Sequence, residues 1–324
     1  MSLTRRRFLH LGGAFAATIP SLASAQSFPT RPVRMIVGFP AGGSTDILAR
    51  DIAGELEKVW GQSVIVDNRG GANGGIAATQ LARLPADGHT LMMIVPGHVT
   101  NPLASPNAGY DAIKDFTPIT LVASSPLLIF AHAGFQASDI RTLLSLAKKS
   151  PNSISYATAG VASINHLSLE LMASLTGTKF VHVPYRGGGP ALNDVIGGHV
   201  PLSVFSVMQV QPHLQAKAIK PLAVTSAKAT DLLPNVPSLA EVGVKDYEAE
   251  IWFAIIAPSG MPPAIAAKIN ADVNRIVKSP SMQQRIAAQG GRPIGSTQDE
   301  LTAFMKAETT KWARVIKDAG IKTE

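Results

Sequence analysis

Short apolar runs alternate with longer amphipathic segments from residue 33 almost to the end of the chain. Apolar runs of strand length, separated by helical patterns, are typical of an open parallel α/β sheet. The 324 residues, 46% of them hydrophobic, are enough for two compact domains, each with its own core. We expect strands at 33–39, 63–67, 90–95, 119–131, 154–158, 180–184, 202–206, 221–226 and 249–258, with helices between most of them.

Two helix starts near the end of the chain and two possible domain crossings also follow from the pattern. Pro262 and Pro263 open a helix, because the missing N–H of a proline in a first turn would be unpaired anyway. Thr297 and Glu300 have the spacing of a capping box for the last helix. The unusually long run 119–131 is a candidate crossing between the two domains, and 221–226 is a candidate return.

A strand, a short Gly- or Ser-rich loop and then a helix follow one another three times. The loops are PAGGSTD at 40–46, TAGVAS at 158–163 and PYRGGGP at 184–190. Glycine lets a ligand approach the backbone, and the free N–H groups of a first helical turn attract an anion without any Lys or Arg. Because ligands of open α/β sheets lie beyond the carboxyl ends of the strands, this pattern favours a receptor for a small anion.

The candidate ligand-binding residues come from these loops and from the end of the strand at 202–206. They are Phe39, Ala41, Gly42, Gly43, Ser44, Asp46, Thr158, Ala159, Ser163, Asn165, His166, Phe205 and Ser206. Structural interpretations compete with this one, since glycine makes tight turns, Ser163 can cap a helix and Asp46 can compensate a helix dipole. His166 and Tyr185 are interpreted as packing and hydrogen-bonding residues, because neither has an evident partner for acid–base catalysis.

Several kinds of chemistry lack their sequence signatures. The chain has no cysteine, which removes disulfides, thiol catalysis and iron–sulfur clusters. Its eight histidines do not fall at metal-ligand spacing, and the signature loops of serine hydrolases and of nucleotide- and dinucleotide-binding proteins are missing. We therefore expect no cofactor, no metal and no catalytic site. The competing class is an exported α/β enzyme that uses Ser163 or His166.

The charge distribution argues against nucleic acid as a partner. The chain has 29 Lys and Arg against 22 Asp and Glu, and three of the arginines lie within the first 25 residues. Without those three the balance is 26 against 22, a net charge of +4. The basic residues are scattered and form no stripe of the kind that neutralises phosphates.

Residues 1–25 are predicted to be an export signal. Three arginines at 5–7 precede an apolar stretch at 8–19, and an A-x-A cleavage site ends at Ala25. The stretch is too short to span a membrane, which needs about 20 apolar residues. TRRRFL at 4–9 also resembles the twin-arginine signal, and an ordinary secretory signal is the open alternative. We expect a periplasmic mature protein that begins at Gln26 and has no stable membrane insertion.

The loop segments also carry a family resemblance. RPVRMIV at 31–37, FPAGGSTD at 39–46 and VDNRGGA at 66–72 resemble the start of the Bug family, the solute receptors of tripartite tricarboxylate transporters. Similar segments follow in order: DGHTL at 87–91, KDF at 114–116, VPYRG at 183–187, GGHV at 197–200, VPSLAE at 236–241, and Trp252 with Ala257 and Pro258. Arg186 stands where the family commonly has Lys, which preserves the charge. Val99 and Thr100 lie in a segment that usually reads His-Ala.

The resemblance implies a type II periplasmic binding protein, with two α/β domains joined by two crossing strands and a ligand cleft between them. Residues 26–124 and 226–324 would form a discontinuous domain 1, and residues 125–225 would form domain 2. The implied ligand is a small carboxylic acid, with one carboxylate held largely by backbone N–H groups and ordered waters. The implied partners are integral-membrane transporter subunits, and a signalling sensor is the alternative partner. We expect a monomer.

Overall fold

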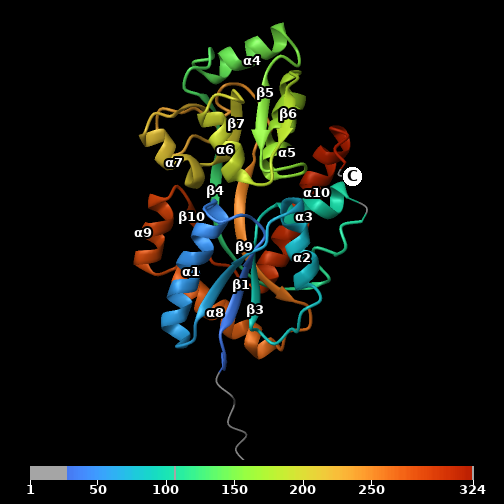
Figure 1. Cartoon of the computed structure of the whole chain (residues 1–324), viewed down its shortest axis with the longest axis vertical. Coiled ribbons are helices and arrows are strands. Elements are labelled where there is room, and N and C mark those ends of the chain that lie inside the picture. Colours follow the sequence, from blue (N-terminus) through green and yellow to red (C-terminus); the bar gives the residue numbers. More distant parts are fainter. Residues whose placement is uncertain (1–27, 106, 323–324) are drawn as a thin grey trace, which may run out of the picture.

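Two α/β domains lie one above the other in the computed structural model, which describes residues 28–105 and 107–322 (Figure 1). The lower domain in Figure 1 contains β1 (Val33–Val37), α1 (Ser44–Trp60), β2 (Val64–Asn68), the 3-10 helix η1 (Ala72–Gly74), α2 (Gly75–Leu81), β3 (Thr90–Ile94), α3 (Gly97–Ala104), α8 (Pro263–Val277), α9 (Pro280–Ala288), β10 (Arg292–Pro293) and α10 (Gln298–Asp318). The upper domain contains α4 (Ile140–Lys149), β5 (Ser155–Thr158), α5 (Ile164–Thr176), β6 (Val181–Pro184), α6 (Gly188–Ile196), β7 (Leu202–Ser206), α7 (Val207–Gln215) and β8 (Ile219–Val224). We call the lower one the first domain and the upper one the second domain.

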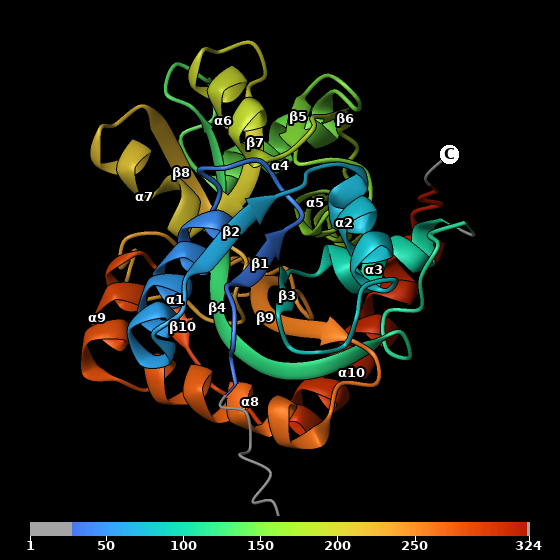
Figure 2. The same ribbon diagram turned by 60° about the horizontal axis from the view of Figure 1, so that its bottom comes forward.

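Two strands run between the domains, β4 (Phe116–His132) and β9 (Glu250–Pro258). Figure 2 shows β4 as one long curved strand that leaves the first domain and enters the second. Its first part pairs with β9, up to Pro126, and from Leu127 onward it pairs with β7 and β8. The expected crossing at 119–131 is therefore confirmed. The return is made by β9, whereas the candidate return 221–226 largely coincides with β8, which pairs with β4 in the second domain.

The strand order is β2-β1-β3-β9-β4-β7-β5-β6, with β8 and β10 also paired to β4. Pairs β1/β2 and β1/β3 are parallel, as are β5/β6 and β5/β7. Strand β4, however, is antiparallel to β7, β8, β9 and β10, and β3 is antiparallel to β9. The parallel arrangement that the alternation of strands and helices indicates thus holds within each domain, whereas the pairings that involve β4 and β9 are antiparallel. Since β4 passes from the first domain to the second and β9 passes back, these two strands necessarily run in opposite directions.

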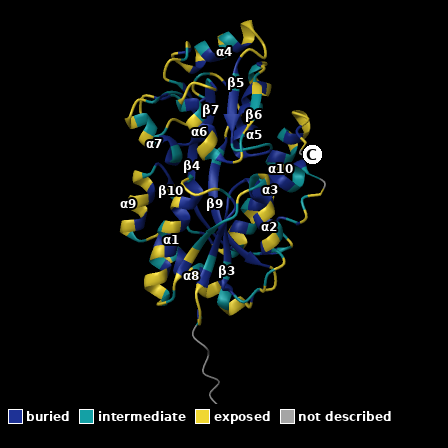
Figure 3. Cartoon of the chain, viewed as in Figure 1, coloured by how far each residue is buried: buried dark blue, intermediate teal, exposed yellow. Residues whose placement is uncertain are grey.

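The core follows the predicted strands. Figure 3 shows buried residues concentrated in the strands, with exposed residues on the outer faces of the helices. All five residues of β7 are buried, as expected of a central strand that is covered on both faces. Helix α8 begins with Pro263 and buries Ile269 and Val273 completely. Thr297 and Glu300 form the expected capping box of α10, so both predicted helix starts are confirmed.

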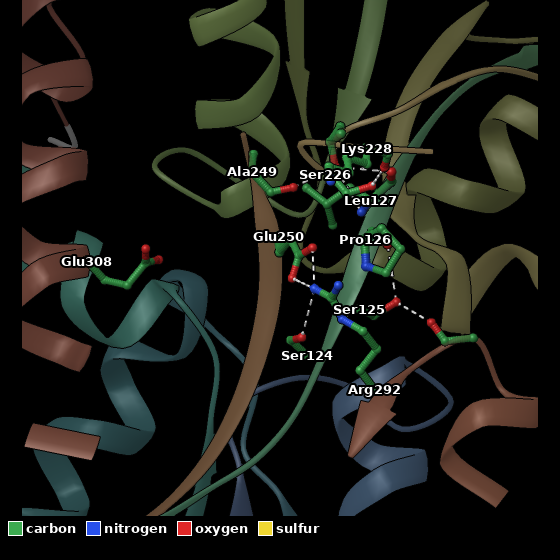
Figure 4. Close-up of polar contacts among 12 residues, drawn as sticks. Ser124, Ser125, Pro126, Leu127, Ser226, Lys228, Ala249, Glu250, Arg292 and Glu308 are labelled. Carbon is green, nitrogen blue, oxygen red and sulfur yellow. Dashed lines mark hydrogen bonds and ion pairs between the residues drawn. The ribbon is translucent and has the colours of Figure 1, made fainter. Parts of the chain in front are cut away.

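Side-chain hydrogen bonds and an ion pair hold the crossing strands together. Thr225, which follows β8, accepts a hydrogen bond from Leu127 N at 2.9 Å, and its hydroxyl lies 2.6 Å from Ala249 O. Figure 4 shows Arg292 extended toward Glu250 and Ser124, with Glu250 as its ion-pair partner. Residues on β4, β9, β10 and the segment after β8 are thus tied together where the chain passes between the domains.

The expected domain boundaries, 124/125 and 225/226, stay a prediction. The segment 227–248 between β8 and β9 contacts the second domain, since Val236 packs in a cluster with Phe130 and Phe205. Tyr247 donates a hydrogen bond from its hydroxyl to Ser168 O on α5 at 3.0 Å.

The predicted export signal lies outside the described residues. Within 28–105 and 107–322, no helix is both long enough and apolar enough to cross a membrane.

Candidate functional site

The carboxyl ends of the parallel strands of both domains converge on one small cavity of about 50 Å³. The loops after β1, β2 and β3 reach it from the first domain, and the loops after β5, β6 and β7 reach it from the second. Ile251 of β9 adds a wall from the crossing strands. No Lys, Arg, Asp or Glu is among the described residues that line this cavity. Its polarity therefore comes from backbone groups, hydroxyls and side-chain amides.

The loop after β1 is shaped by a buried carboxylate. Asp46 is 3% exposed and accepts hydrogen bonds from Gly42 N at 3.0 Å, Arg50 Nε at 3.0 Å and Asn68 Nδ2 at 2.9 Å. Burial alone would raise the pKa of Asp46, but the hydrogen bonds from Arg50, Gly42 and Asn68 together hold that pKa below its usual value. Gly42 has φ of +88°, in the left-handed region that favours glycine. Asp46 thus fixes the turn that presents the start of α1.

The first turn of α1 lies at the cavity. Gly43, Ser44 and Thr45 all line it, with Gly43 in an extended conformation at the N-cap position. The first N–H groups of a helix have no acceptor within the helix. They also carry the positive end of the helix dipole. This wall therefore presents hydrogen-bond donors without a cationic side chain.

The loop after β5 is held by hydrogen bonds on both sides. Ser163 caps α5 by accepting from His166 N at 3.3 Å, and its hydroxyl donates to Gly160 O at 2.7 Å. Ala162 has φ of +58°, which is uncommon for a residue other than glycine. Its N–H donates to His166 Nδ1 at 3.2 Å, and its carbonyl accepts from Thr100 Oγ1 of α3 at 2.8 Å. The second bond joins the two domains beside the cavity.

His166 supports this loop from behind. Its ring stacks on that of His182, with the ring centroids 3.8 Å apart. Burial, together with the neighbouring His182, lowers the pKa of His166 to about 3, so the ring is neutral near pH 7. Because Nδ1 accepts from Ala162 and Ser163 donates to a carbonyl, Ser163 and His166 do not form a nucleophile–base pair. The arrangement offers no activated serine.

The loops after β6 and β7 complete the second-domain wall. Gly188 and Gly189 line the cavity at the start of α6. A Cβ at Gly188 would lie 2.7 Å from Gln209 Nε2, so a larger residue there would displace the end of the Gln209 side chain from the cavity lining. Ser206 caps α7 by accepting from Gln209 N at 3.3 Å, and Phe205 lies in the same lining. Five helices of the two domains, α1, α3, α5, α6 and α7, thus begin at or beside the cavity.

The structure brings eight of the thirteen candidate residues into the cavity lining. These are Phe39, Gly43, Ser44, Ala159, Ser163, Asn165, Phe205 and Ser206. The other candidates lie in or beside the same loops without lining the cavity: Ala41, Gly42, Asp46, Thr158 and His166. Ten lining residues are missing from the candidate list: Pro40, Thr45, Asn73, Val95, Gly97, Ile164, Gly188, Gly189, Gln209 and Ile251. Gly188 and Gly189 could have been predicted from the PYRGGGP loop at 184–190, whereas no sequence pattern indicates that Asn73 or Gln209 lines the cavity.

The two α/β domains are joined by crossing strands, and the carboxyl ends of their parallel strands meet at a shared cavity. This arrangement defines a type II periplasmic binding protein. Within this class, the chain belongs to the receptor family of tripartite tricarboxylate transporters. The sequence profile of the "Tripartite tricarboxylate transporter family receptor" matches residues 48–321.

Individual relatives agree with this assignment. BugT of Bordetella pertussis is 34% identical over 329 residues, with 99% of each chain covered. A protein of R. palustris solved with adipate has a TM-score of 0.89 and 38% identity, covering 91% of this chain and 99% of the other. The periplasmic binding protein BugD has a TM-score of 0.87 and 33% identity, covering 92% and 100%. MatC of Rhodopseudomonas palustris, solved with malate, has a TM-score of 0.84 and 30% identity, covering 89% and 100%.

Proposed function

We propose that this chain is a periplasmic receptor that captures a small carboxylic acid between its two domains and delivers it to a membrane transporter of the tripartite type. The observation that carries the proposal is the convergence of six strand ends and several helix N-termini on a cavity without charged side chains. Helix N-termini suit carboxylates, because their N–H groups point outward and their dipole favours negative charge. The adipate and malate found in two similar structures are carboxylates, which supports the same ligand class.

The thirteen candidate residues divide into two roles within this proposal. The eight that line the cavity contact the ligand, mainly through backbone N–H groups and the hydroxyls of Ser44, Ser163 and Ser206. The other five set the shape of the loops, as the hydrogen bonds of Asp46 and His166 indicate. The chain then acts without catalysis, cofactor or metal.

Export, delivery and oligomeric state are further parts of the proposal. Residues 1–25 direct export, and cleavage after Ala25 leaves Gln26 as the first residue of the mature protein. The mature protein acts as a monomer that delivers its ligand to integral-membrane subunits. N-terminal sequencing of periplasmic protein tests the cleavage site, and light scattering on the purified protein tests the monomer.

A thermal unfolding screen tests the ligand class. A ligand at 100 times its dissociation constant stabilises a protein by about 2.7 kcal/mol, which raises the melting temperature measurably. We expect one or more small carboxylic acids to raise it, and mass spectrometry to recover the acid unchanged. A screen in which sugars or cationic amines raise the melting temperature and carboxylic acids do not would overturn the proposal. Conversion of the acid during incubation would favour an enzyme instead.

A further inference from the structure

The excess positive charge of the chain lies in residues 125–225, which make up most of the second domain. This segment has seven Lys and Arg against three Asp and Glu, whereas residues 26–124 and 226–324 together have 19 of each kind. Every ion pair that a Lys or Arg forms within 28–105 and 107–322 lies outside 125–225. The cations of the second domain are therefore not neutralised by the described carboxylates.

Three of these cations gather at one end of the second domain. Lys148 and Lys149 end α4, Lys179 lies two residues before β6, and all three are exposed. The chain after α4 brings them together, since Asn152 N donates a hydrogen bond to Lys179 O at 3.1 Å. Figure 1 shows α4 at the end of the second domain that is farthest from the first domain. We call Lys148, Lys149 and Lys179 the basic patch.

Helix stability does not account for the whole basic patch. Lysines at the end of a helix compensate its dipole, which explains Lys148 and Lys149. Lys179, however, belongs to no helix. Beside Lys179 lie two exposed apolar side chains, Leu175 at 45% and Val181 at 43% exposure. Exposed cations with apolar neighbours are typical of a surface that contacts another protein.

Strand β6 has a free edge next to the basic patch. It ends the strand order and pairs with β5 alone among the described strands. Val181 N donates to Ile154 O at 2.9 Å, and Tyr185 N donates to Thr158 O at 3.0 Å, both on the β5 side. Because successive N–H groups of a strand point in opposite directions, the N–H of His182 points away from β5. An unpaired edge of this kind is a template for a strand of another chain.

The charge beside this edge determines which strand it accepts. Lysine near an edge strand discourages pairing with a second copy of the same chain, because like charges would meet. The same charge attracts a segment that carries Asp or Glu. Pro184, at the end of β6, has no N–H to donate, so the pairing is limited to the first part of the strand.

We propose that an acidic, extended segment of the membrane transporter docks here, pairing with the edge of β6 and placing its carboxylates at the basic patch. The inference rests on the proposed function, because it assigns the surface through which the receptor reaches its transporter. A polypeptide fits this surface better than a lipid head group, since a strand edge is satisfied by the N–H and C=O groups of another strand. The patch lies at the starts of β5 and β6, whereas the cavity lies at their ends, so docking leaves the cavity free.

Surface plasmon resonance tests the docking surface. The mature protein flows over nanodiscs of zwitterionic lipid that hold the integral-membrane subunits of the transporter. It is compared with the triple variant Lys148→Glu, Lys149→Glu, Lys179→Glu. The control changes three exposed cations of the first domain and alters the net charge by the same amount: Arg83→Glu, Lys306→Glu, Lys317→Glu.

We expect the triple variant of the basic patch to associate about tenfold or more slowly, and the control to associate nearly as the parent does. Association of the parent should also slow as salt is raised, because salt screens charges on exposed side chains. Thermal unfolding checks that each variant is folded. All variants should keep the parent's affinity for the carboxylic acid that gives the largest thermal shift, since the basic patch does not line the cavity.

Hydrogen exchange on the same complex tests the strand pairing. Exchange in residues 180–184 should slow when the subunits bind, because the outward N–H of His182 gains an acceptor. Strand β2 is the internal control, since it lies at the other end of the strand order and should exchange as in the free protein. Unchanged exchange in 180–184 of the bound protein would overturn the pairing with β6.

The remaining outcomes separate this inference from the proposed function. Equal association of the triple variant and the parent would overturn the docking surface while leaving delivery to the transporter intact. Equally strong binding of the parent to nanodiscs of anionic lipid without the subunits would replace the protein partner by a lipid surface. A parent that binds a carboxylic acid but no subunits would refute both docking and delivery, and a parent that binds no acid would refute the proposed function itself.

Discussion

Gly43 and Ser163 offer the most direct test of the site at the scale of single residues, because they lie on opposite walls of the small cavity. A Cβ at Gly43 would meet nothing closer than Pro40 O at 4.0 Å, and the backbone there is extended, so the fold tolerates a side chain. We expect Gly43→Val to weaken ligand binding about tenfold or more by occupying space that the carboxylate needs. Calorimetry measures the change, with Gly54→Val on the exposed face of α1 as the control. If Gly43→Val and the control bind the ligand with equal affinity, the loop between β1 and α1 does not contact the ligand.

Ser163→Ala removes a hydroxyl from the second-domain wall and also removes the cap of α5. We expect a stability loss of about 1 kcal/mol from the lost cap. Loss of a side-chain bond to a charged ligand would add a 10- to 100-fold weakening of binding, about 1.5–3 kcal/mol. Ser279→Ala is the matched control, since Ser279 caps α9 in the same way and does not line the cavity. Unchanged affinity in Ser163→Ala would mean that Ser163 serves only as a cap.

Two buried histidines should make the free energy of unfolding depend on pH. Burial lowers the pKa of His98 to about 4, against its bond to Ala112 O, and lowers the pKa of His166 to about 3. A folded-state pKa below the unfolded value of about 6.5 means that the unfolded chain binds more protons between these values. Stability is therefore fully present above pH 6.5 and falls with decreasing pH, by at most about 1.4 kcal/mol per pH unit for each group.

Urea unfolding at pH 7, 6 and 5 measures this dependence. His98→Gln should show a smaller loss of stability between pH 7 and pH 5 than the parent does. An identical pH dependence in His98→Gln and the parent would contradict the assigned cause.

At the scale of elements, the loop between β1 and α1 depends on a carboxylate that does not line the small cavity. Asp46→Ala would leave Gly42 N, Arg50 and Asn68 without their common acceptor. We expect a stability loss of about 1–3 kcal/mol and weaker ligand binding, since the loop that presents Gly43 would no longer be fixed.

Asp272→Ala is the matched control for Asp46→Ala. Asp272 on α8 is similarly buried and accepts from Trp60 Nε1, Lys268 and Arg275, but it does not line the small cavity. This variant should lose comparable stability and keep its ligand affinity, as measured by calorimetry well below the melting temperature. Equal affinity in the two variants would show that the loop keeps its shape without Asp46.

At the scale of the whole molecule, we expect ligand binding to depend on the relative position of the domains, because residues of both domains line the small cavity. Thr100 of α3 donates to Ala162 O across the domain boundary, yet it does not line the small cavity. Thr100→Val should disfavour the arrangement in which the domains touch, because Ala162 O would lose its partner there and gain water when the domains separate. A ligand that binds the closed arrangement would then bind about two- to tenfold more weakly.

Calorimetry and small-angle scattering check this coupling. At equal subsaturating ligand concentration, Thr100→Val should show less compaction than the parent. Thr302→Val is the control, since its hydroxyl bonds to Gln298 O within α10. Parent-like affinity and compaction in Thr100→Val would show that this hydrogen bond does not influence closure.

Local features of the sequence determined most of the secondary structure. The strands at 90–95 and 202–206, the Pro263 start of α8 and the Thr297–Glu300 capping box follow from periodicity and capping within a few neighbouring residues. The resemblance to a receptor family, visible in the loop segments, also indicated the two-domain class that the fold shows.

The tertiary structure alone decided which of these loops meet and what each polar side chain does there. The antiparallel pairing of β4 with β9 and the arrival of Asn73 and Gln209 at one cavity depend on contacts between residues far apart in the chain. From the sequence, Asp46 and His166 are candidates for contact with a ligand. In the structure they accept hydrogen bonds from Arg50 and from Ala162 N, respectively, and thereby stabilise the loops beside the cavity. A sequence pattern reports the spacing of side chains along one element, whereas hydrogen-bond partners are chosen only when the elements pack.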